Sequence, residues 1–489
     1  MGTILKRILD KYNKSHVQVR AALWFLICSF LQKGISMITT PIFTRIMSTE
    51  EYGQFGVFNS WYGIATIIVG LGLYKGVHAQ GLIKYDQERS VFTSSLQGLL
   101  TTLVTAWTII YLIFHDFWNN LFTLTTVQVL CMLIMIWTTA VFSFWANEQR
   151  VTYSYRTLVA VTLIASLSAP LLGIFLILHS NDKVTARILG IVLVELIAYG
   201  WMFFFSMKRG KIFFSKRFWV YALGFNLPLV PHYLSQTVLN SADRIMIQRM
   251  VGQSEAGIYN LAYSLSLIMT IFNTALMQTI NPWMYQKIKD KKGKEIAPIA
   301  YGTLILIAAV NLMLILLAPE AVAIFAPASY YDAIWVIPPV AMSAFFMYSY
   351  DLFAKFAFYY EKTKFVMMAS VVGAALNIGL NYICIKAFGY VAAGYTTLTC
   401  YIVYCIAHYL FMKKVCDQFC DGEYPYETKR ILKIAIPFLA VGFGLLSTYR
   451  FPLIRYGIVV VAVVLVVIMR KRIMEMFKDL MSLRKKNVI

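Results

Sequence analysis

Charged residues are scarce in this 489-residue chain: they make up 14% of it, against about 25% in a typical soluble domain. Hydrophobic residues reach 59%, and the mean hydropathy is +0.66. Apolar runs near 20 residues recur along the whole chain, and a helix needs about 20 such residues to cross a bilayer. The alternation over about ten residues that marks barrel strands is missing. We therefore expect an all-α polytopic membrane protein, not a soluble enzyme, a disordered scaffold or an outer-membrane barrel.

The sequence also lacks the common nucleotide, zinc and hydrolase motifs. It contains no G-x-x-x-x-G-K-[ST], no H-E-x-x-H and no G-x-S-x-G. The seven cysteines have no paired metal-ligand spacing, and we interpret them as free thiols. We therefore expect no catalytic residue, no metal and no cofactor, and we expect that the protein is not an enzyme.

Fourteen apolar runs between charge clusters are the predicted membrane spans, and about 14 transmembrane helices are expected. The spans are 20–46, 52–82, 91–114, 122–147, 156–178, 185–206, 219–248, 256–280, 297–318, 331–357, 364–386, 389–412, 431–449 and 452–470.

Lys and Arg residues set the predicted orientation. The net charge of +21 comes from short basic runs between the spans, which argues against a nucleic-acid partner. Of the 44 Lys and Arg residues, 34 fall in alternate segments on one side and eight in those on the other. Because basic loops stay in the cytoplasm, both termini are predicted to be cytoplasmic.

A pattern recurs at an offset of 204 residues, and each copy joins two predicted spans on the outer side. The copies are Arg45-(5)-Glu51-x-Gly53-x-Phe55 and Arg249-(5)-Glu255-x-Gly257-x-Tyr259. Ser48-x-x-Glu51 also has the capping-box pattern, so part of the match has a local explanation. We infer duplication into two six-helix lobes in a parallel pseudo-twofold repeat, an arrangement that transporters use for alternating access. The predicted domains are lobes 1–206 and 219–412, two additional helices within 431–470, and a basic cytoplasmic tail, 471–489.

Charged groups at bilayer depth cost at least about 2.5–3.5 kcal/mol each, so they mark candidate cavities. Lys33 lies roughly 20 Å along its span from Arg20, near mid-membrane, on a polar stripe with nearby Ser and Thr residues. The seventh span carries His232, Gln236, Asn240, Arg244 and Gln248 at i+4 spacing. This stripe is either a buried network, in which Asp243 offsets Arg244, or the wall of a solvated cavity.

These positions give the predicted site. The substrate-binding residues are Lys33, Arg45, Lys75, His232, Gln236, Asn240, Arg244, Asn377 and Asn381, and the candidate ion-coupling residues are Glu195, Asp243 and Asp351. Lys75 lies either in the cavity or near its inner mouth. Glu195 is mid-span with no obvious local cation, whereas Asp351 and Lys355 have the i+4 spacing of a local ion pair.

The motifs resemble those of the polysaccharide-transporter (Wzx-like) branch of the multidrug/oligosaccharidyl-lipid/polysaccharide (MOP) superfamily. The residues that carry the resemblance are Pro41-x-x-Thr44-Arg45-x-x-Ser48-x-x-Glu51-Tyr52-Gly53-x-Phe55, then Ala242-Asp243-Arg244, Gly252-x-x-x-Ala256-Gly257-x-Tyr259 and Asn281-Pro282-x-x-Tyr285. The resemblance implies a flippase that moves a polyprenyl-pyrophosphate-linked oligosaccharide across the bacterial inner membrane for surface polysaccharide such as O-antigen. It implies this substrate, membrane lipids, and a polysaccharide polymerase with its chain-length machinery as partners.

Three alternatives remain. A drug/cation antiporter of the same superfamily is expected to have an acidic cavity, whereas Lys33, Lys75 and Arg244 match an anionic head group. Fourteen spans are also similar to the lipid II flippases, whose last two helices form a lipid-tail groove. A membrane glycosyltransferase or polymerase, from a different class, would need acid or base groups in a sizeable outer loop, and the outer loops are short.

Overall fold

The computed structural model describes residues 16–468, 470–471 and 474, and no strand occurs among them. The expected all-α fold is confirmed. The chain divides into two compact units between Thr237 and Val238, inside a helix of the predicted seventh span. The lobes of six helices each, predicted to part between residues 206 and 219, stay a prediction.

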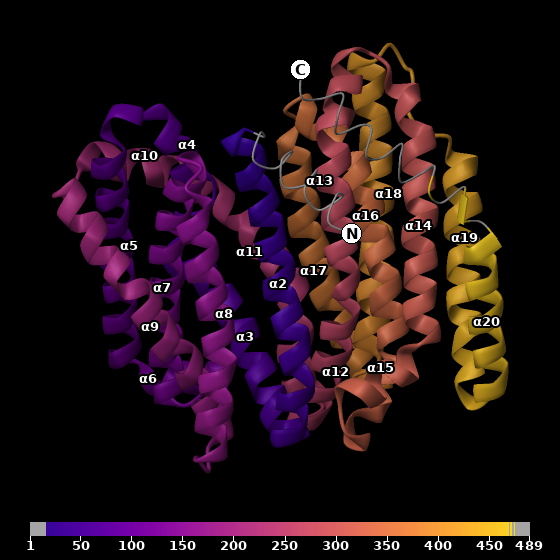
Figure 1. Cartoon of the computed structure of the whole chain (residues 1–489), viewed down its shortest axis with the longest axis horizontal. Helices are drawn as coiled ribbons and strands as arrows, with labels where there is room; N and C mark the ends of the chain where they lie inside the picture. The colour runs from indigo at the N-terminus through magenta and orange to yellow at the C-terminus, as the bar shows by residue number, and fades with distance from the viewer. Residues whose placement is uncertain (1–15, 469, 472–473, 475–489) are drawn as a thin grey trace, which may run out of the picture. The chain divides into compact units, whose positions relative to one another are not determined.

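The first unit is a bundle in which α5, α7, α8 and α9 lie side by side (Figure 1). Its α3 begins at the predicted capping box, in which the Ser48 amide donates to Glu51 Oε2 over 2.7 Å. The elements are α2 (Val17–Ile46), α3 (Thr49–Gly70), α4 (Gly76–Lys84), η1 (Asp86–Glu88), α5 (Arg89–Ile113), α6 (His115–Phe122), α7 (Thr126–Val151), α8 (Tyr155–Leu178), α9 (Lys183–Gly210), α10 (Lys216–Asn226), η2 (Leu227–Leu229) and the first part of α11 (Val230–Met250).

The second unit is built around α16, which packs against α13, α14, α18 and α19 and buries Phe345, Phe353 and Phe356. Together with the remainder of α11, its elements are α12 (Gln253–Ser266), α13 (Ile268–Lys289), η3 (Gly293–Glu295), α14 (Ile296–Leu316), α15 (Ala318–Phe325), η4 (Ala328–Trp335), α16 (Ile337–Tyr359), α17 (Thr363–Phe388), α18 (Ala392–Phe419), α19 (Thr428–Leu446), η5 (Ser447–Arg450) and α20 (Pro452–Ile468).

Ten helices among the described residues are long and apolar enough to cross a membrane, or eleven if the bent pair η4–α16 is one span. Each of the fourteen predicted spans coincides with a helix or a helix pair, and fourteen membrane crossings stay a prediction. Four predicted spans do not coincide with any of these ten helices. They correspond to the interrupted pair α3–α4, the polar α11, the bent pair η4–α16, and α20, which has only 17 residues.

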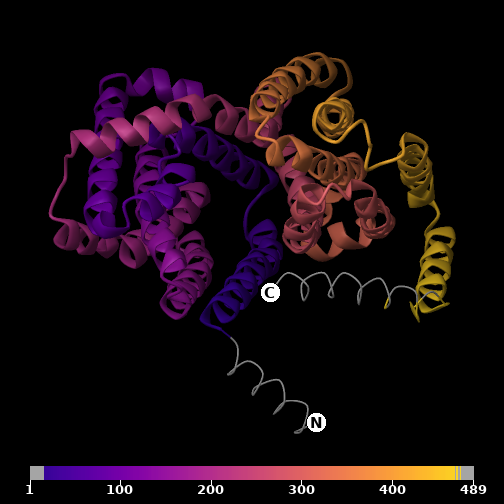
Figure 2. The same cartoon turned by 90° about the horizontal axis from the view of Figure 1, so that it is seen from above.

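The helices α19 and α20, drawn in yellow, lie at the edge of the second unit (Figures 1 and 2). Most of α20 is exposed apolar surface, with Leu453 88% exposed, as a lipid-facing helix requires. Its buried Arg455 pairs with Glu320 of α15. The predicted basic tail, 471–489, lies outside the described residues except for 471 and 474. All seven cysteines are free thiols, as predicted.

Candidate functional site

A buried polar network in the second unit is centred on Asp243 of α11. The carboxylate is 1% exposed and accepts hydrogen bonds from three side chains on three other helices. Asn381 Nδ2 of α17 donates over 2.5 Å, Tyr259 Oη of α12 over 2.7 Å, and Thr397 Oγ1 of α18 over 2.9 Å. Because each donor comes from a different helix, the Asp243 carboxylate ties four helices together.

The orientation of the Asn381 amide is set by its other neighbours. Its Oδ1 accepts from the Thr396 hydroxyl, so its NH2 group faces Asp243. The same NH2 group donates to Asn377 Oδ1 over 3.2 Å. Asp243, Asn377 and Asn381 are thus buried and joined by hydrogen bonds through the Asn381 amide.

Asn240, about one turn before Asp243 on α11, and Arg244, the next residue after it, contact tyrosines of the neighbouring helices. Asn240 Oδ1 accepts from Tyr263 Oη over 3.3 Å and from Tyr401 Oη over 3.2 Å. The guanidinium carbon of half-buried Arg244 lies 4.3 Å from the centre of the Tyr263 ring. Five predicted site residues, Asn240, Asp243, Arg244, Asn377 and Asn381, are thus brought together in this unit.

The second predicted span is interrupted in the first unit. Helix α3 ends where Leu71 and Gly72 adopt positive φ values of 50° and 64°, and α4 begins after Lys75. Side-chain amides bind the carbonyl oxygens that the break frees: Asn226 Nδ2 lies 3.0 Å from Leu71 O, and Asn147 Nδ2 lies 2.8 Å from Tyr74 O. A Cβ on residue 72 would lie 3.1 Å from the Tyr233 ring. The break therefore requires the glycine.

Lys75 and His232 lie together beside this interruption. Lys75 is exposed, its Nζ lies 4.7 Å from the centre of the Tyr233 ring, and it is close enough to His232 to interact with it electrostatically. Within the described chain, the buried His232 Nδ1 has no hydrogen-bond partner. Lys75 also directly precedes the N-terminus of α4, where the backbone N–H groups favour an anion. The arrangement suits a negatively charged group.

The remaining predicted substrate-binding residues are not in these two clusters. Lys33 is exposed on α2, and the hydroxyls of Ser29 and Thr40 on its stripe donate to carbonyls of their own helix. Arg45 is exposed and donates to Pro41 O over 2.9 Å. Gln236 is half-buried on α11.

The other candidate ion-coupling residues differ in their partners. Asp351 and Lys355 form the predicted local ion pair, with 2.7 Å between Oδ1 and Nζ. Glu195 of α9 instead accepts from two hydroxyls of α7, those of Thr138 at 2.6 Å and Thr139 at 3.3 Å. These hydroxyl partners distinguish Glu195 from Asp351, which is paired with a lysine.

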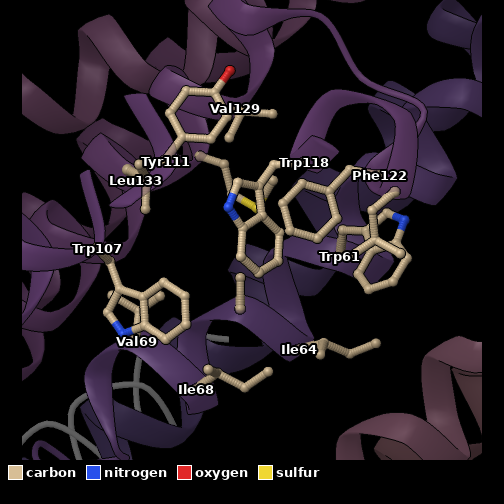
Figure 3. A pocket seen from close by; sticks show the side chains of 13 residues that line it. Trp61, Ile64, Ile68, Val69, Trp107, Tyr111, Trp118, Phe122, Val129 and Leu133 are labelled. Atoms are coloured by element: carbon tan, nitrogen blue, oxygen red, sulfur yellow. The ribbon is translucent and has the colours of Figure 1, made fainter. Parts of the chain in front are cut away.

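An apolar cavity of about 150 Å³ lies between α3, α5, α6 and α7 (Figure 3). Its walls hold the aromatic rings of Trp61, Trp107, Trp118 and Phe122, and the Tyr111 hydroxyl is bound to Asn119. A cavity of this size and lining stays dry and accepts apolar guests. The complete lining is Trp61, Ile64, Ala65, Ile68, Val69, Trp107, Tyr111, Trp118, Leu121, Phe122, Val129, Met132 and Leu133.

The hydroxyl groups that bind Asp243 and Glu195 were not predicted from the sequence. Tyr259 stands in the repeated motif, but the motif does not reveal that its hydroxyl binds Asp243. Thr397, which also binds Asp243, lies in the predicted span 389–412, which contains no predicted site residue. The adjacent Thr138 and Thr139 in an apolar span were the available signal for the partners of Glu195.

Two family models match the chain. The one described as polysaccharide biosynthesis protein covers residues 19–288, more than half of the chain, and the one described as MatE covers residues 228–383. The Lsg locus putative protein 1 of Haemophilus influenzae is 28% identical over 215 residues, which are 41% of this chain and 52% of that protein. The chain thus spans about half the length of this relative. An uncharacterized membrane protein of the same organism is 20% identical over 365 residues, 73% of this chain and 87% of its own.

Solved structures share the fold at low sequence identity. The lipid II flippase MurJ, in an inward closed conformation, matches with a TM-score of 0.72 at 14% identity and covers 92% of this chain and 100% of its own. An inward-facing multidrug resistance MATE family transporter of the MOP superfamily matches with a TM-score of 0.60 at 13% identity, over 80% of this chain and 96% of its own. At these identities the likeness shows the fold alone.

Proposed function

The chain belongs to the polysaccharide biosynthesis protein family, within the MOP superfamily of transporters and flippases, and from this premise we propose its substrate. The substrate is a lipid-linked oligosaccharide with a polyprenyl pyrophosphate group. The protein flips it across the bacterial inner membrane by alternating access, with both termini in the cytoplasm, for surface polysaccharide biosynthesis.

The pairing of Lys75 with His232 beside the interrupted span carries this proposal. In the predicted orientation, Lys75 lies toward the cytoplasmic end of the predicted span 52–82. A substrate made in the cytoplasm reaches the protein from that side. Three groups here can bind the oxygens of a pyrophosphate. They are the Lys75 ammonium, His232 Nδ1, which has no hydrogen-bond partner among the described residues, and the first backbone N–H groups of α4. Lys33 and Arg45 of the first unit and Arg244 of the second are proposed as further contacts, because each places a positive charge in a predicted membrane span.

Two alternatives remain testable because specific observations favour them. The MatE match over residues 228–383 favours a drug/cation antiporter, whose cargo is positively charged. The fold shared with MurJ favours a lipid II flippase. Against the antiporter stands the second unit itself, where the buried Asp243 already accepts three hydrogen bonds and Asp351 is paired with Lys355. Neither carboxylate is left open to attract a cationic drug.

Deletion of the gene, followed by lipid extraction, tests the function. We expect lipid-linked oligosaccharide to accumulate, and this extracted lipid is then reconstituted with the purified protein in vesicles. An impermeant glycosidase added outside should reach the inner-leaflet sugar only when the protein is present. Unchanged surface polysaccharide, together with altered sensitivity to cationic dyes, would instead indicate the antiporter. Accumulation of lipid II with intact surface polysaccharide would indicate the other flippase.

A further inference from the structure

Glu195 is a carboxylate in the middle of a membrane-spanning helix. It lies 12 residues after Lys183, the first residue of α9, or roughly 18 Å along the axis. It is half-buried, and no Lys or Arg of the described residues forms an ion pair with it. A carboxylate at this depth without a cation costs several kcal/mol if it stays ionised, and such groups mark ion or proton pathways.

The helices packed against α9 bring few titratable groups to Glu195. These helices are α3, α5, α7 and α8, and the titratable side chains that interact with the carboxylate are Tyr62 of α3 and Tyr199 of α9 itself. The charged residues on the same helices are at their ends, among them Glu148, which pairs with Arg209 of α9. The remaining charges at these helix ends are Glu50, Glu51, Arg89, Arg150, Arg156, Lys183, Arg187 and Lys208.

The Thr138 hydroxyl can serve either protonation state of Glu195. Its single proton has two acceptors within reach, Glu195 Oε2 at 2.6 Å and Met135 O at 3.2 Å. When Glu195 is ionised, the Thr138 hydroxyl donates to it. When Glu195 is protonated, its O–H donates to Thr138 Oγ1, and the Thr138 proton turns to Met135 O. Both states keep every hydrogen bond satisfied without moving a heavy atom.

Thr139 offers a second hydroxyl with the same property. Its Oγ1 accepts from Tyr62 Oη over 2.9 Å and lies 3.3 Å from Glu195 Oε2. Since hydroxyl groups both donate and accept, the chain from Tyr62 through Thr139 to Glu195 tolerates gain or loss of one proton.

The surroundings of Asp243 differ from those of Glu195 at one of its two oxygens. Its Oδ1 faces the NH2 group of Asn381, which can only donate, and its Oδ2 accepts from Tyr259 and Thr397. A proton on Oδ1 would point at the Asn381 amide hydrogens, whereas the Tyr259 and Thr397 hydroxyls at Oδ2 can donate or accept. Both oxygens of Glu195, in contrast, face only hydroxyl groups.

We propose that Glu195 is a proton-binding site whose loading and unloading drives transport by this protein. The step is the transfer of one proton between water and Glu195 Oε2, with only O–H bonds made and broken. The link to transport rests on the proposed function, whereas proton binding itself does not.

Infrared difference spectroscopy of the purified full-length protein tests proton binding directly. Between about pH 5 and about pH 9, the wild type should show a carbonyl band of a protonated carboxylic acid that disappears as pH rises. Glu195→Gln should lack this band. Asp351→Asn, which removes a lysine-paired carboxylate, should keep it and serves as the matched control. A band that persists in Glu195→Gln, or that is absent from the wild type, would overturn the proposal.

Variants of Thr138 test whether its hydroxyl binds both the ionised and the protonated form of Glu195. Thr138→Ser keeps the hydroxyl and should retain the band at its wild-type titration midpoint. Thr138→Val removes the hydroxyl, and loss of one hydrogen bond to the ionised form should shift the midpoint upward by about one pH unit. Equal midpoints in the two variants would show that Thr138 has no part in proton binding.

Vesicle assays link proton binding to transport. An imposed pH gradient should accelerate flipping of extracted lipid-linked oligosaccharide by the wild type and leave the rate of Glu195→Gln unchanged. If the Glu195 band is present but no oligosaccharide is flipped by the wild type, the proposed function fails while the proton site stands. If flipping occurs and the gradient accelerates Glu195→Gln equally, the coupling role of Glu195 is excluded.

Discussion

Asn381 donates a hydrogen bond to Asp243 over 2.5 Å, and the two residues are 138 positions apart in the sequence. The contact fixes α17 against α11. Thr396 of α18 donates to Asn381 Oδ1, so the Asn381 NH2 group faces the Asp243 carboxylate. A residue of a third helix therefore orients the donor of this contact. Stability of the second unit and the charge state of Asp243 are therefore linked.

Asp243→Asn should destabilise the second unit. The new amide group would face at least one of the three donors, and a buried donor left unpaired costs about 1–3 kcal/mol. Thermal unfolding in detergent, followed by tryptophan fluorescence, measures the effect. Asn377→Ala is the control, because it removes only the 3.2 Å acceptor of Asn381 and should cost about 0.5–1.5 kcal/mol. Equal stability of Asp243→Asn and wild type would contradict the network.

Lys75→Gln should weaken export strongly while the protein still accumulates in the membrane. One charge-assisted contact is worth about 1.5–3 kcal/mol, or a roughly 10- to 150-fold weaker interaction with the substrate. Lys84→Gln, at the other end of α4, is the matched control, since Lys84 also lies over a tyrosine ring, 4.5 Å from the centre of Tyr221. Surface polysaccharide and protein abundance are measured together. Similar export in the two variants would remove Lys75 from the site.

Lys33→Gln should also reduce export, and Lys33→Arg should retain more of it, because the charge is kept although the shape differs. Lys33 is exposed on α2, so neither change should reduce protein abundance. Complementation of a deletion strain, with the protein quantified by immunoblot, checks this. Wild-type export in Lys33→Gln would show that the lysine does not contact the substrate.

Arg244→Gln, alone and with Asp243→Asn, separates binding from structure. Arg244 lies on the Tyr263 ring, so its loss should affect export more than abundance. Export and abundance are measured for the single and double variants. Restoration of both export and abundance in the double variant would make the pair structural, whereas restored abundance without export would assign Arg244 to the substrate.

Reporter fusions test the predicted orientation. A reporter active only in the cytoplasm should be active after Lys216, at the start of α10, and after Lys292, between α13 and α14. It should be silent near Asn181, between α8 and α9, and near Glu320 in α15. The reverse pattern at these four positions would contradict both the orientation and the parallel repeat.

The sequence allowed the helical fold to be predicted, because helix formation depends on local patterns. Apolar runs located the helices, and Ser48 with Glu51 located a helix start. The i+4 stripe on α11 predicted that Asn240 and Arg244 share one face of the helix, and both contact tyrosines of neighbouring helices. Which helices approach that stripe depends on tertiary packing, which no local pattern encodes. Tyr259 and Thr397 could therefore not be assigned to Asp243 beforehand.

The interruption after Leu71 was only partly foreseeable. Several glycines in the second predicted span indicated close packing, but the same composition is compatible with an unbroken helix. What makes the break stable is the pair of amides that bind the exposed carbonyls, and Asn147 and Asn226 belong to other helices. The spatial distance from either asparagine to the break cannot be read from the sequence.

That interruption also has a consequence for biogenesis. The Tyr74 carbonyl is bound by a side chain 73 residues further along the chain, and the Leu71 carbonyl by one 155 residues further along. A ribosome makes both asparagines well after the segment itself has emerged. Until then, water or the insertion machinery must satisfy the two carbonyls. The region around residues 71–75 therefore cannot be complete until Asn226 has been made, and premature termination before Asn226 leaves it incomplete.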